Sequence, residues 1–251
     1  MCRGAQTAAP RCTISPLVRV LGISTSSDRG SVALWRDGAV VGRCAYEGSM
    51  HHAELLFAAL DELLTTAGLE RTSIQAIGCD VGPGSFTGVR AGLAAAKGLA
   101  LGLGAPLVGV GSLEALAAAA FAALPAEQVA LAACLLDAKR GETFLAVYDR
   151  GLGAMALPAH VRTDEALSAL GPWLARPEVW LVGQQCLALP EPLDRSRVLA
   201  AELCALPDAT WVAGLAALRL ASSAEAVLGD VEPVYIRAPD AVPAPSRKRL
   251  G

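Results

Sequence analysis

The chain has 251 residues, which is long enough for one large domain or for two lobes that each hold a core. Hydrophobic residues make up 53% of the chain and aromatic residues only 4%, so Ala, Leu and Val must build most of that core. The net charge of −3 argues against binding of nucleic acid through the overall field of the chain, because domains that bind in this way are usually basic.

The seven cysteines are scattered and form no C-x-x-C pair. This usage favours reduced thiols and a cytoplasmic protein over a disulfide framework. We expect no signal peptide, since no continuous apolar stretch precedes Leu17. We also expect no membrane span, because the longest uncharged stretch, residues 98–113, contains Pro106 and several glycines.

The first half of the chain alternates between strand and helix patterns. Short apolar runs predict strands, and longer segments with apolar residues at helical spacing predict helices. Arg36-Asp37-Gly38 supplies a hairpin turn, and Gly68 supplies a helix C-cap. The predicted strands cover 19–24, 31–35, 39–46, 74–81 and 107–110, and the predicted helices cover 52–67 and 85–103.

The second half repeats this order of elements without repeating the residues. Ser112 is expected to cap a helix that runs to about Leu124, and Thr163 is expected to open another. The other elements expected there are strands over 129–136, 143–148, 155–162 and 179–182, a helix over 209–221, and an extended segment over 233–237.

The repeat predicts an α/β fold of two related lobes, each with a mixed sheet flanked by helices. The lobes are expected to cover residues 17–110 and 111–237. Residues 1–16 and 238–251 are expected to be disordered. The basic cluster Arg247-Lys248-Arg249 could touch RNA, although a solvated tail is the favoured interpretation.

The most informative stretch joins the strand at 74–81 to the helix at 85–103. A glycine-rich turn before a helix can present backbone N–H groups to a phosphate. This turn lacks the Gly-Lys-Ser or Gly-Lys-Thr of a P-loop and Pro83 has no N–H to donate, so a tight turn with Ser85 as N-cap is favoured. Arg90 could pair with a carboxylate, a partner or a phosphate. The stretch, called the signature turn below, comprises Gly82, Pro83, Gly84, Ser85, Phe86, Thr87, Gly88, Val89 and Arg90.

Five segments, in order along the chain, resemble the TsaB (YeaZ) family. The signature turn, followed by Gly92 and Lys97, is the most specific of them. The others are residues 21–26 with 31–35, the helix that begins at His52, residues 136–142, and residues 233–237.

The resemblance implies the two-lobed actin, Hsp70 and sugar-kinase superfold, which is ribonuclease H-like. It also implies a noncatalytic partner of the paralogous TsaD, which transfers threonylcarbamoyl to the adenosine beside the anticodon of tRNA. TsaE, a P-loop ATPase, joins that complex. ATP, Mg²⁺ and a metal are then expected on the partner subunits, this chain is expected to hold no cofactor of its own, and tRNA is expected to be reached indirectly.

Family members pair through two helices, with TsaD or with a second copy, so the resemblance places a partner interface on the helices at 52–67 and 85–103. Both helices are apolar around most of their circumference, which packing against their own sheet would also explain. The interface residues expected are Leu55, Leu56, Ala59, Leu60, Leu63, Val89, Ala91, Ala94, Ala95 and Gly98.

Ser24 stands where kinase-like members of the superfold, and many TsaB proteins, carry an acidic residue. A serine hydroxyl has no charge to hold Mg²⁺ tightly, which counts against an independent ATPase. His51 and His52 are adjacent, whereas the metal pair of the catalytic paralogue lies four residues apart on one helical face, so no metal site is expected here. His52 is expected to pack or hydrogen-bond near the start of its helix.

Several alternatives stay open at this point. An ATP-binding phosphotransferase would need an acidic residue at position 24, and a metallopeptidase-like protein would need the histidine pair. A homodimer without a TsaD role would use the same two helices. The charged residues at 137–142 fit a hairpin turn, or a contact with a partner or tRNA.

Overall fold

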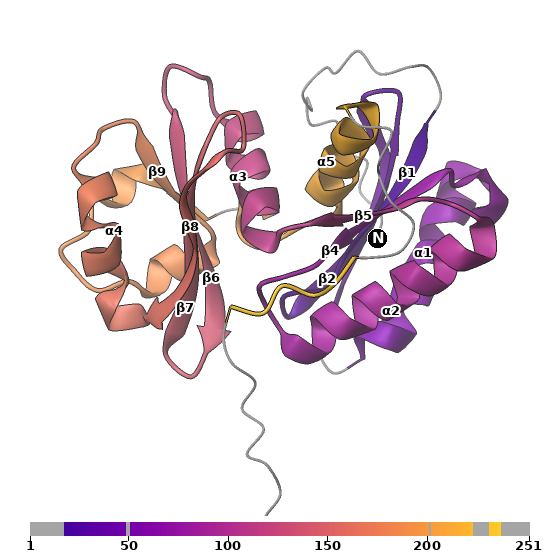
Figure 1. Cartoon of the computed structure of the whole chain (residues 1–251), viewed down its shortest axis with the longest axis horizontal. Helices are drawn as coiled ribbons and strands as arrows, with labels where there is room; N and C mark the ends of the chain where they lie inside the picture. Colours follow the sequence, from indigo (N-terminus) through magenta and orange to yellow (C-terminus); the bar gives the residue numbers. More distant parts are fainter. Residues whose placement is uncertain (1–17, 49–50, 201, 223–230, 237–251) are drawn as a thin grey trace, which may run out of the picture.

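The computed structural model describes residues 18–48, 51–200, 202–222 and 231–236. The two segments expected to be disordered, 1–16 and 238–251, lie outside these residues. Two five-stranded mixed sheets lie on either side of a central pair of helices (Figure 1). This arrangement confirms the predicted fold class, a two-lobed α/β protein of actin-like type with duplicated mixed sheets flanked by helices.

The first sheet comes from the first half of the chain. Its strands are β1 (Arg19–Ser24), β2 (Arg29–Arg36), β3 (Ala39–Glu47), β4 (Ala76–Asp80) and β5 (Leu107–Val110), and its helices are α1 (His52–Ala67) and α2 (Phe86–Leu103). The order is β3-β2-β1-β4-β5, antiparallel from β3 to β1 and parallel from β1 to β5. Side chains alternate along β1, so Leu21 and Ile23 pack under α1 and α2 while Val20 faces the opposite side.

The second sheet has the same plan. Its strands are β6 (Leu131–Lys139), β7 (Glu142–Asp149), β8 (Ala154–Arg162), β9 (Val179–Val182) and β10 (Val198–Leu199), and α3 (Ser112–Ala123) and α4 (Ala166–Leu174) accompany it. The order β8-β7-β6-β9-β10 matches the first sheet strand for strand.

Short 3₁₀ turns occur in both halves of the chain. They cover Arg71–Ser73, Thr163–Glu165, Gln184–Ala188, Arg195–Arg197 and Glu202–Cys204.

The helix that follows each sheet in the chain packs on the other sheet. Helix α3 contacts β6, β7 and β9, whereas α5 (Ala209–Ser222) contacts β1, β2, β4 and β5. Helices α3 and α5 also contact each other, and one apolar cluster runs from Val20 and Trp35 through both helices to Cys134 and Phe144. We call this cluster the shared core. It joins the two sheets at the centre of the molecule (Figure 1).

Most predicted elements are present with shifts of a few residues at their ends. The helix over 52–67 ends at Gly68, whose φ of 65° is left-handed, and the strands over 107–110 and 179–182 are confirmed. The predicted cap at Ser112 is wrong: Gly111 precedes the helix, and the Ser112 hydroxyl donates to a buried carboxylate instead. The lobe division stays a prediction, and α5, which that division gives to the second lobe, packs on the first sheet.

Among the helices in the described ranges, none combines the length and apolar character that crossing a membrane requires.

Candidate functional site

A wholly buried carboxylate lies where the parallel strands of the first sheet end. Asp80 is the last residue of β4, and its Oδ2 accepts hydrogen bonds from the hydroxyls of Ser24 at 2.8 Å and Ser26 at 2.5 Å. Its Oδ1 accepts from the Ser112 hydroxyl at 2.5 Å and from the backbone N–H of Gly82 at 3.0 Å. Asp80 therefore ties the end of β1, the signature turn and the start of α3 together.

Burial raises the pKa of Asp80, and the hydrogen bonds from Ser112, Ser26, Gly82 and Ser24 oppose that shift without cancelling it. Both carboxylate oxygens are occupied by donors, and the residue has no exposed surface. The Ser24 hydroxyl is itself committed to Asp80. The residues at the end of β1 therefore do not fit a bound magnesium ion, which needs open oxygen ligands.

The signature turn has an inner and an outer part. Gly82, Pro83, Gly88 and Val89 are buried; Gly84 and Ser85 are half-buried; Phe86, Thr87 and Arg90 are exposed. The predicted N-cap is confirmed, since the Ser85 hydroxyl accepts from the N–H of Gly88 at 3.2 Å. Four N–H groups of the turn are already used inside the chain: Gly82 N donates to Asp80, Ser85 N to Ser26 O, Gly88 N to the Ser85 hydroxyl and Val89 N to Ser85 O. A phosphate cradle has correspondingly fewer donors to offer.

His52 lies beneath this turn. It is buried, and its Nε2 lies 3.0 Å from the carbonyl oxygen of Ser27, which can only accept, so Nε2 carries the proton. Burial lowers the pKa of His52. Packing and hydrogen bonding at the helix start are thus confirmed for this residue. Within the described ranges, no group of three or more His, Cys, Asp or Glu side chains could hold a metal ion.

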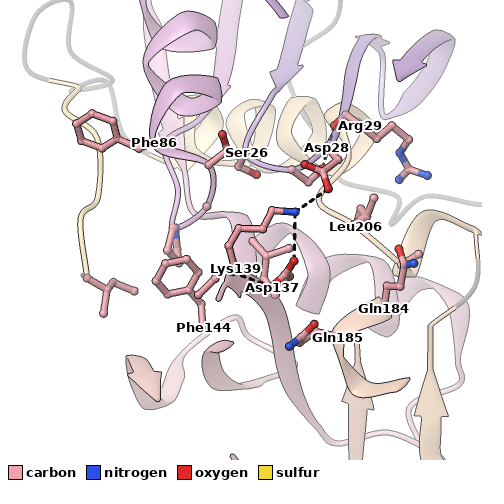
Figure 2. Close-up of a pocket in the computed structure, with 18 of the residues that line it drawn as sticks. Ser26, Asp28, Arg29, Phe86, Asp137, Lys139, Phe144, Gln184, Gln185 and Leu206 are labelled. Atoms are coloured by element: carbon pink, nitrogen blue, oxygen red, sulfur yellow. Dashed lines mark hydrogen bonds and ion pairs between the residues drawn. The ribbon is translucent and has the colours of Figure 1, made fainter. Parts of the chain in front are cut away.

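A cleft of about 1270 Å³ opens between the two lobes. One wall carries the signature turn and the loop after β1, and the other carries the β6–β7 hairpin with Gln184 and Gln185 (Figure 2). Lys139 of that hairpin reaches across to Asp28, with Nζ 2.7 Å from Oδ2, and also contacts Asp137 at 3.2 Å. The Asp28 hydrogen bond raises the pKa of Lys139. This ion pair bridges the cleft.

The charged residues at 137–142 form the predicted hairpin turn. Lys139, Arg140 and Gly141 all have left-handed φ angles, of 65°, 55° and 75°. The side chain of Asp137 also accepts from the N–H of Lys139 at 2.7 Å, as turn aspartates commonly do. The turn thereby aims Lys139 into the cleft (Figure 2).

The two helices of the predicted interface differ in what they expose. On α1, Leu56, Ala59, Leu60 and Leu63 are packed in the core beneath the helix, and Leu55 is half-buried. On α2, Val89 is buried, Ala91 and Ala95 are half-buried, and Ala94 and Gly98 are exposed. A Cβ built on Gly98 would meet no atom within 4 Å. Packing against the sheet thus accounts for the α1 stripe, and the exposed members of the predicted interface, Ala94 and Gly98, lie on α2.

Three aspartates of the site region were not singled out in the sequence. Asp80 could have been found as an acidic residue at the end of an apolar strand, and Asp208 as an N-cap residue directly before a helix. Asp208 is wholly buried and accepts from both Nε and Nη2 of Arg43, at 3.0 and 2.5 Å. Asp28 has no such signal, because its partner Lys139 lies 111 residues away.

Comparison with known proteins identifies relatives along nearly the whole chain. The family model for TsaD, tRNA N6-adenosine threonylcarbamoyltransferase, matches residues 44–232. The Escherichia coli protein named tRNA threonylcarbamoyladenosine biosynthesis protein TsaB is 32% identical over 88% of this chain and 95% of its own length. The Bacillus subtilis protein of the same name is 32% identical over 51% of this chain and 54% of its own length.

A solved structure shows the same fold. It comes from Pseudomonas aeruginosa, is described as an uncharacterized protein with similarity to peptidase YEAZ, and has a TM-score of 0.71 at 27% identity. The match covers 88% of this chain and 100% of that one. Together with the extent of the match to the Escherichia coli protein, this confirms the resemblance seen in the sequence: the chain belongs to the TsaB (YeaZ) family.

Proposed function

We propose that the chain is a noncatalytic scaffold and activator subunit in the bacterial complex that transfers a threonylcarbamoyl group to the adenosine next to the anticodon of tRNA. Membership of a family whose relatives are named tRNA threonylcarbamoyladenosine biosynthesis proteins supports the pathway. The enclosed Asp80, whose oxygens are all occupied, supports a role without catalysis on this chain. A TsaD-like subunit would carry the transfer.

The exposed face of α2 carries the proposal. Ala94 and Gly98 lie one helical turn apart and face solvent, with Ala91 and Ala95 half-buried beside them. Leu101, one turn further along, is 85% exposed. Small residues let another backbone approach closely, and an exposed leucine next to them gains from burial. A helix of the TsaD-like subunit packed along α2 would cover this face.

The mechanism proposed is a shift of population. A subunit that binds only the competent arrangement of its partner raises the share of partner molecules in that arrangement. A TsaE-like ATPase would dock on the assembled pair, with ATP, Mg²⁺ and metal held by the partner subunits and none by this chain. The chain would reach tRNA only through the complex, and the complex would act in the cytoplasm. A second copy of the chain could occupy the same face when the partner is absent.

The test pairs two alanine-to-glutamate variants on exposed helix positions. Ala94→Glu puts a charge on the α2 face, whereas Ala123→Glu puts the same charge at the exposed end of α3. The chain would be mixed with its cognate TsaD-like protein and analysed by size exclusion with light scattering, alongside threonylcarbamoyl transfer to tRNA. We expect Ala94→Glu to lose both the mixed complex and the transfer, and Ala123→Glu to keep both.

Two results would contradict the proposal. If wild-type chain neither binds the TsaD-like protein nor changes transfer, the scaffold role fails. If wild-type chain binds but Ala94→Glu binds equally well, the partner contacts another surface. A complex that contains two copies of this chain and no TsaD-like protein would favour the homodimer. Leu56→Asp is unsuitable for this test, because Leu56 lies in the core and its substitution would unfold the lobe.

A further inference from the structure

A short segment near the C-terminal end, residues 231–236, crosses from the first lobe to the second (Figure 1). We call it the strap. It has no regular secondary structure, and it is held by contacts with α2 and with the end of β4. The backbone N–H of Val234 donates to the carbonyl oxygen of Val81 at 2.8 Å, and Glu232 pairs with Lys97 of α2 at 3.2 Å.

A cluster of three side chains in mutual contact fixes the strap to the exposed part of the signature turn. The Arg90 guanidinium lies 3.8 Å from the centre of the Phe86 ring, and its Nε donates to the hydroxyl of Tyr235 at 2.7 Å. The rings of Phe86 and Tyr235 lie 5.3 Å apart at a tilt of 38°. Cation–π and aromatic contacts of this kind are favourable at partly exposed sites. The cluster gives Phe86 and Arg90 partners within their own chain.

Two glycines leave room for the strap. A Cβ on Gly82 would lie 3.0 Å from the carbonyl oxygen of Val234, and the φ of Gly82, 98°, also favours glycine. A Cβ on Gly109 would lie 2.9 Å from a methyl group of Val231. Both glycines lie where strap and sheet meet, so the backbone of the first lobe is shaped to receive this segment.

The far end of the strap reaches the cleft. Val234, Tyr235 and Ile236 line it, and Ile236 packs against the shared core. The opposite wall is the β6–β7 hairpin with Lys139. Six residues of extended chain span at most about 20 Å, so a strap fixed at both ends limits how far α2 can move from the second lobe.

We propose that the strap is a tether that couples the exposed face of α2 to the width of the cleft. When Tyr235 leaves Phe86 and Arg90, the cleft widens and the hairpin at Lys139 loosens. Linkage is reciprocal, so anything that holds the cleft closed also holds the strap on α2. The tether is a property of the isolated chain and does not depend on the proposed function.

The strap is a segment that can leave its site. Tyr235 is 46% exposed and Val234 is 44% exposed, so neither side chain is locked into the core. Segments with few buried apolar contacts open locally at lower free energy than the rest of a protein. The lobes stay joined by the shared core when the strap opens, so opening changes the cleft without unfolding the chain.

Hydrogen exchange of the full chain tests the tether with matched variants. Tyr235→Ala removes both the ring contact and the hydroxyl. Tyr235→Phe removes only the hydrogen bond to Arg90. Arg71→Ala is the control. It breaks the exposed ion pair between Arg71 and Asp61, which lies in the same lobe and involves no strap residue. The reporter is the hairpin across the cleft, including the Lys139 amide that donates to Asp137.

We expect Tyr235→Ala to speed exchange about tenfold both in the signature turn and in residues 137–142, which corresponds to ~1.4 kcal/mol of opening free energy. We expect Tyr235→Phe to speed both by a smaller factor and Arg71→Ala to change neither. Faster exchange in the signature turn alone would overturn the proposal, because the strap would then be a local contact of α2. Unchanged exchange at both sites would overturn it as well.

Discussion

Two aspartates in the described part of the chain are wholly buried, and their surroundings push their pKa values in opposite directions. Asp80 meets only hydroxyl and amide donors, so burial prevails and its pKa is raised. Burial would also raise the pKa of Asp208, but the hydrogen bonds and charge of Arg43 outweigh it and the pKa is lowered. The difference is the positive charge of Arg43, because the donors to Asp80 are all uncharged. Asp208 is therefore ionised, and it accepts a hydrogen bond from the N–H of Thr210 at the start of α5.

We predict that Asp208→Asn destabilises the protein by about 3 kcal/mol at pH 7, because it leaves the Arg43 guanidinium without its buried counter-charge. The folded-state pKa of Asp208 lies below the unfolded value of about 3.9, so its contribution is present above that pH and is lost as the pH falls through the folded pKa. Urea unfolding of wild type and variant, at neutral pH and in acid, measures the difference.

The control for this prediction is Asp61→Asn, which breaks the exposed pair with Arg71 and should cost less than about 1 kcal/mol at either pH. The stability gap between Asp208→Asn and wild type should close in acid. A gap of equal size at both pH values would mean that the carboxylate acts through its shape and its cap to Thr210, not through its charge.

At the scale of single elements, α1 and α2 show how far the sequence determines a surface. Both helices are apolar around most of their circumference, and that pattern alone cannot tell a second buried face from an exposed one. The structure packs Leu60 and Leu63 against the sheet and leaves Ala94 and Gly98 in solvent. The apolar pattern of α2 is thus compatible with one open side, on which the predicted interface residues Ala94 and Gly98 lie.

Two glycines of α2, six residues apart, give opposite predictions. A Cβ on Gly98 would meet nothing, so Gly98→Ala should stabilise the chain by about 0.5–1 kcal/mol through a less flexible unfolded state. A Cβ on Gly92 would overlap Oγ1 of Thr25, so Gly92→Ala should destabilise the chain by about 1–3 kcal/mol. Thermal unfolding of the two variants measures both changes.

A stabilising Gly92→Ala would mean that Thr25 can turn away from α2 and give up its hydrogen bond to the carbonyl of Gly88. The Gly98 variant also bears on the proposed partner face. A methyl group that stabilises the free chain but weakens the complex with a TsaD-like protein would indicate that a backbone passes close to Gly98. If Gly98→Ala binds the TsaD-like protein as tightly as wild type does, Gly98 lies at the edge of the contact.

Local signals predicted the elements well and their long-range partners poorly. The end of α1 at Gly68 and the capping of α2 by Ser85 depend on neighbours in sequence, and both are confirmed. Ser112 has the composition of a cap, but its hydroxyl serves Asp80, which lies 32 residues earlier. The contact of Arg90 with Tyr235 spans 145 residues. Such pairs follow from topology, which a pattern of single residues does not encode.

For the molecule as a whole, the decisive feature is an exchange of two helices, because the helix that follows each sheet in the chain packs on the other sheet. Each lobe has its own sheet and outer helices, yet α3 and α5 lie between the sheets and belong to one apolar cluster. Arg219 of α5 also holds Glu114 of α3 with two hydrogen bonds, at 2.6 and 2.7 Å. The inner face of each sheet is therefore buried by a helix that follows the other sheet in the chain.

This exchange predicts that the two lobes unfold together, in a single transition. Fluorescence of the double variant Trp173→Phe, Trp180→Phe comes only from Trp35 and Trp211, which lie in the shared core beside the first sheet. Far-UV circular dichroism reports both sheets at once. We expect the two signals to give the same urea midpoint. A fluorescence midpoint that precedes the dichroism midpoint would mean that the second sheet survives without α5 and its neighbours, so each lobe would be a separate folding unit and the shared core a mere contact.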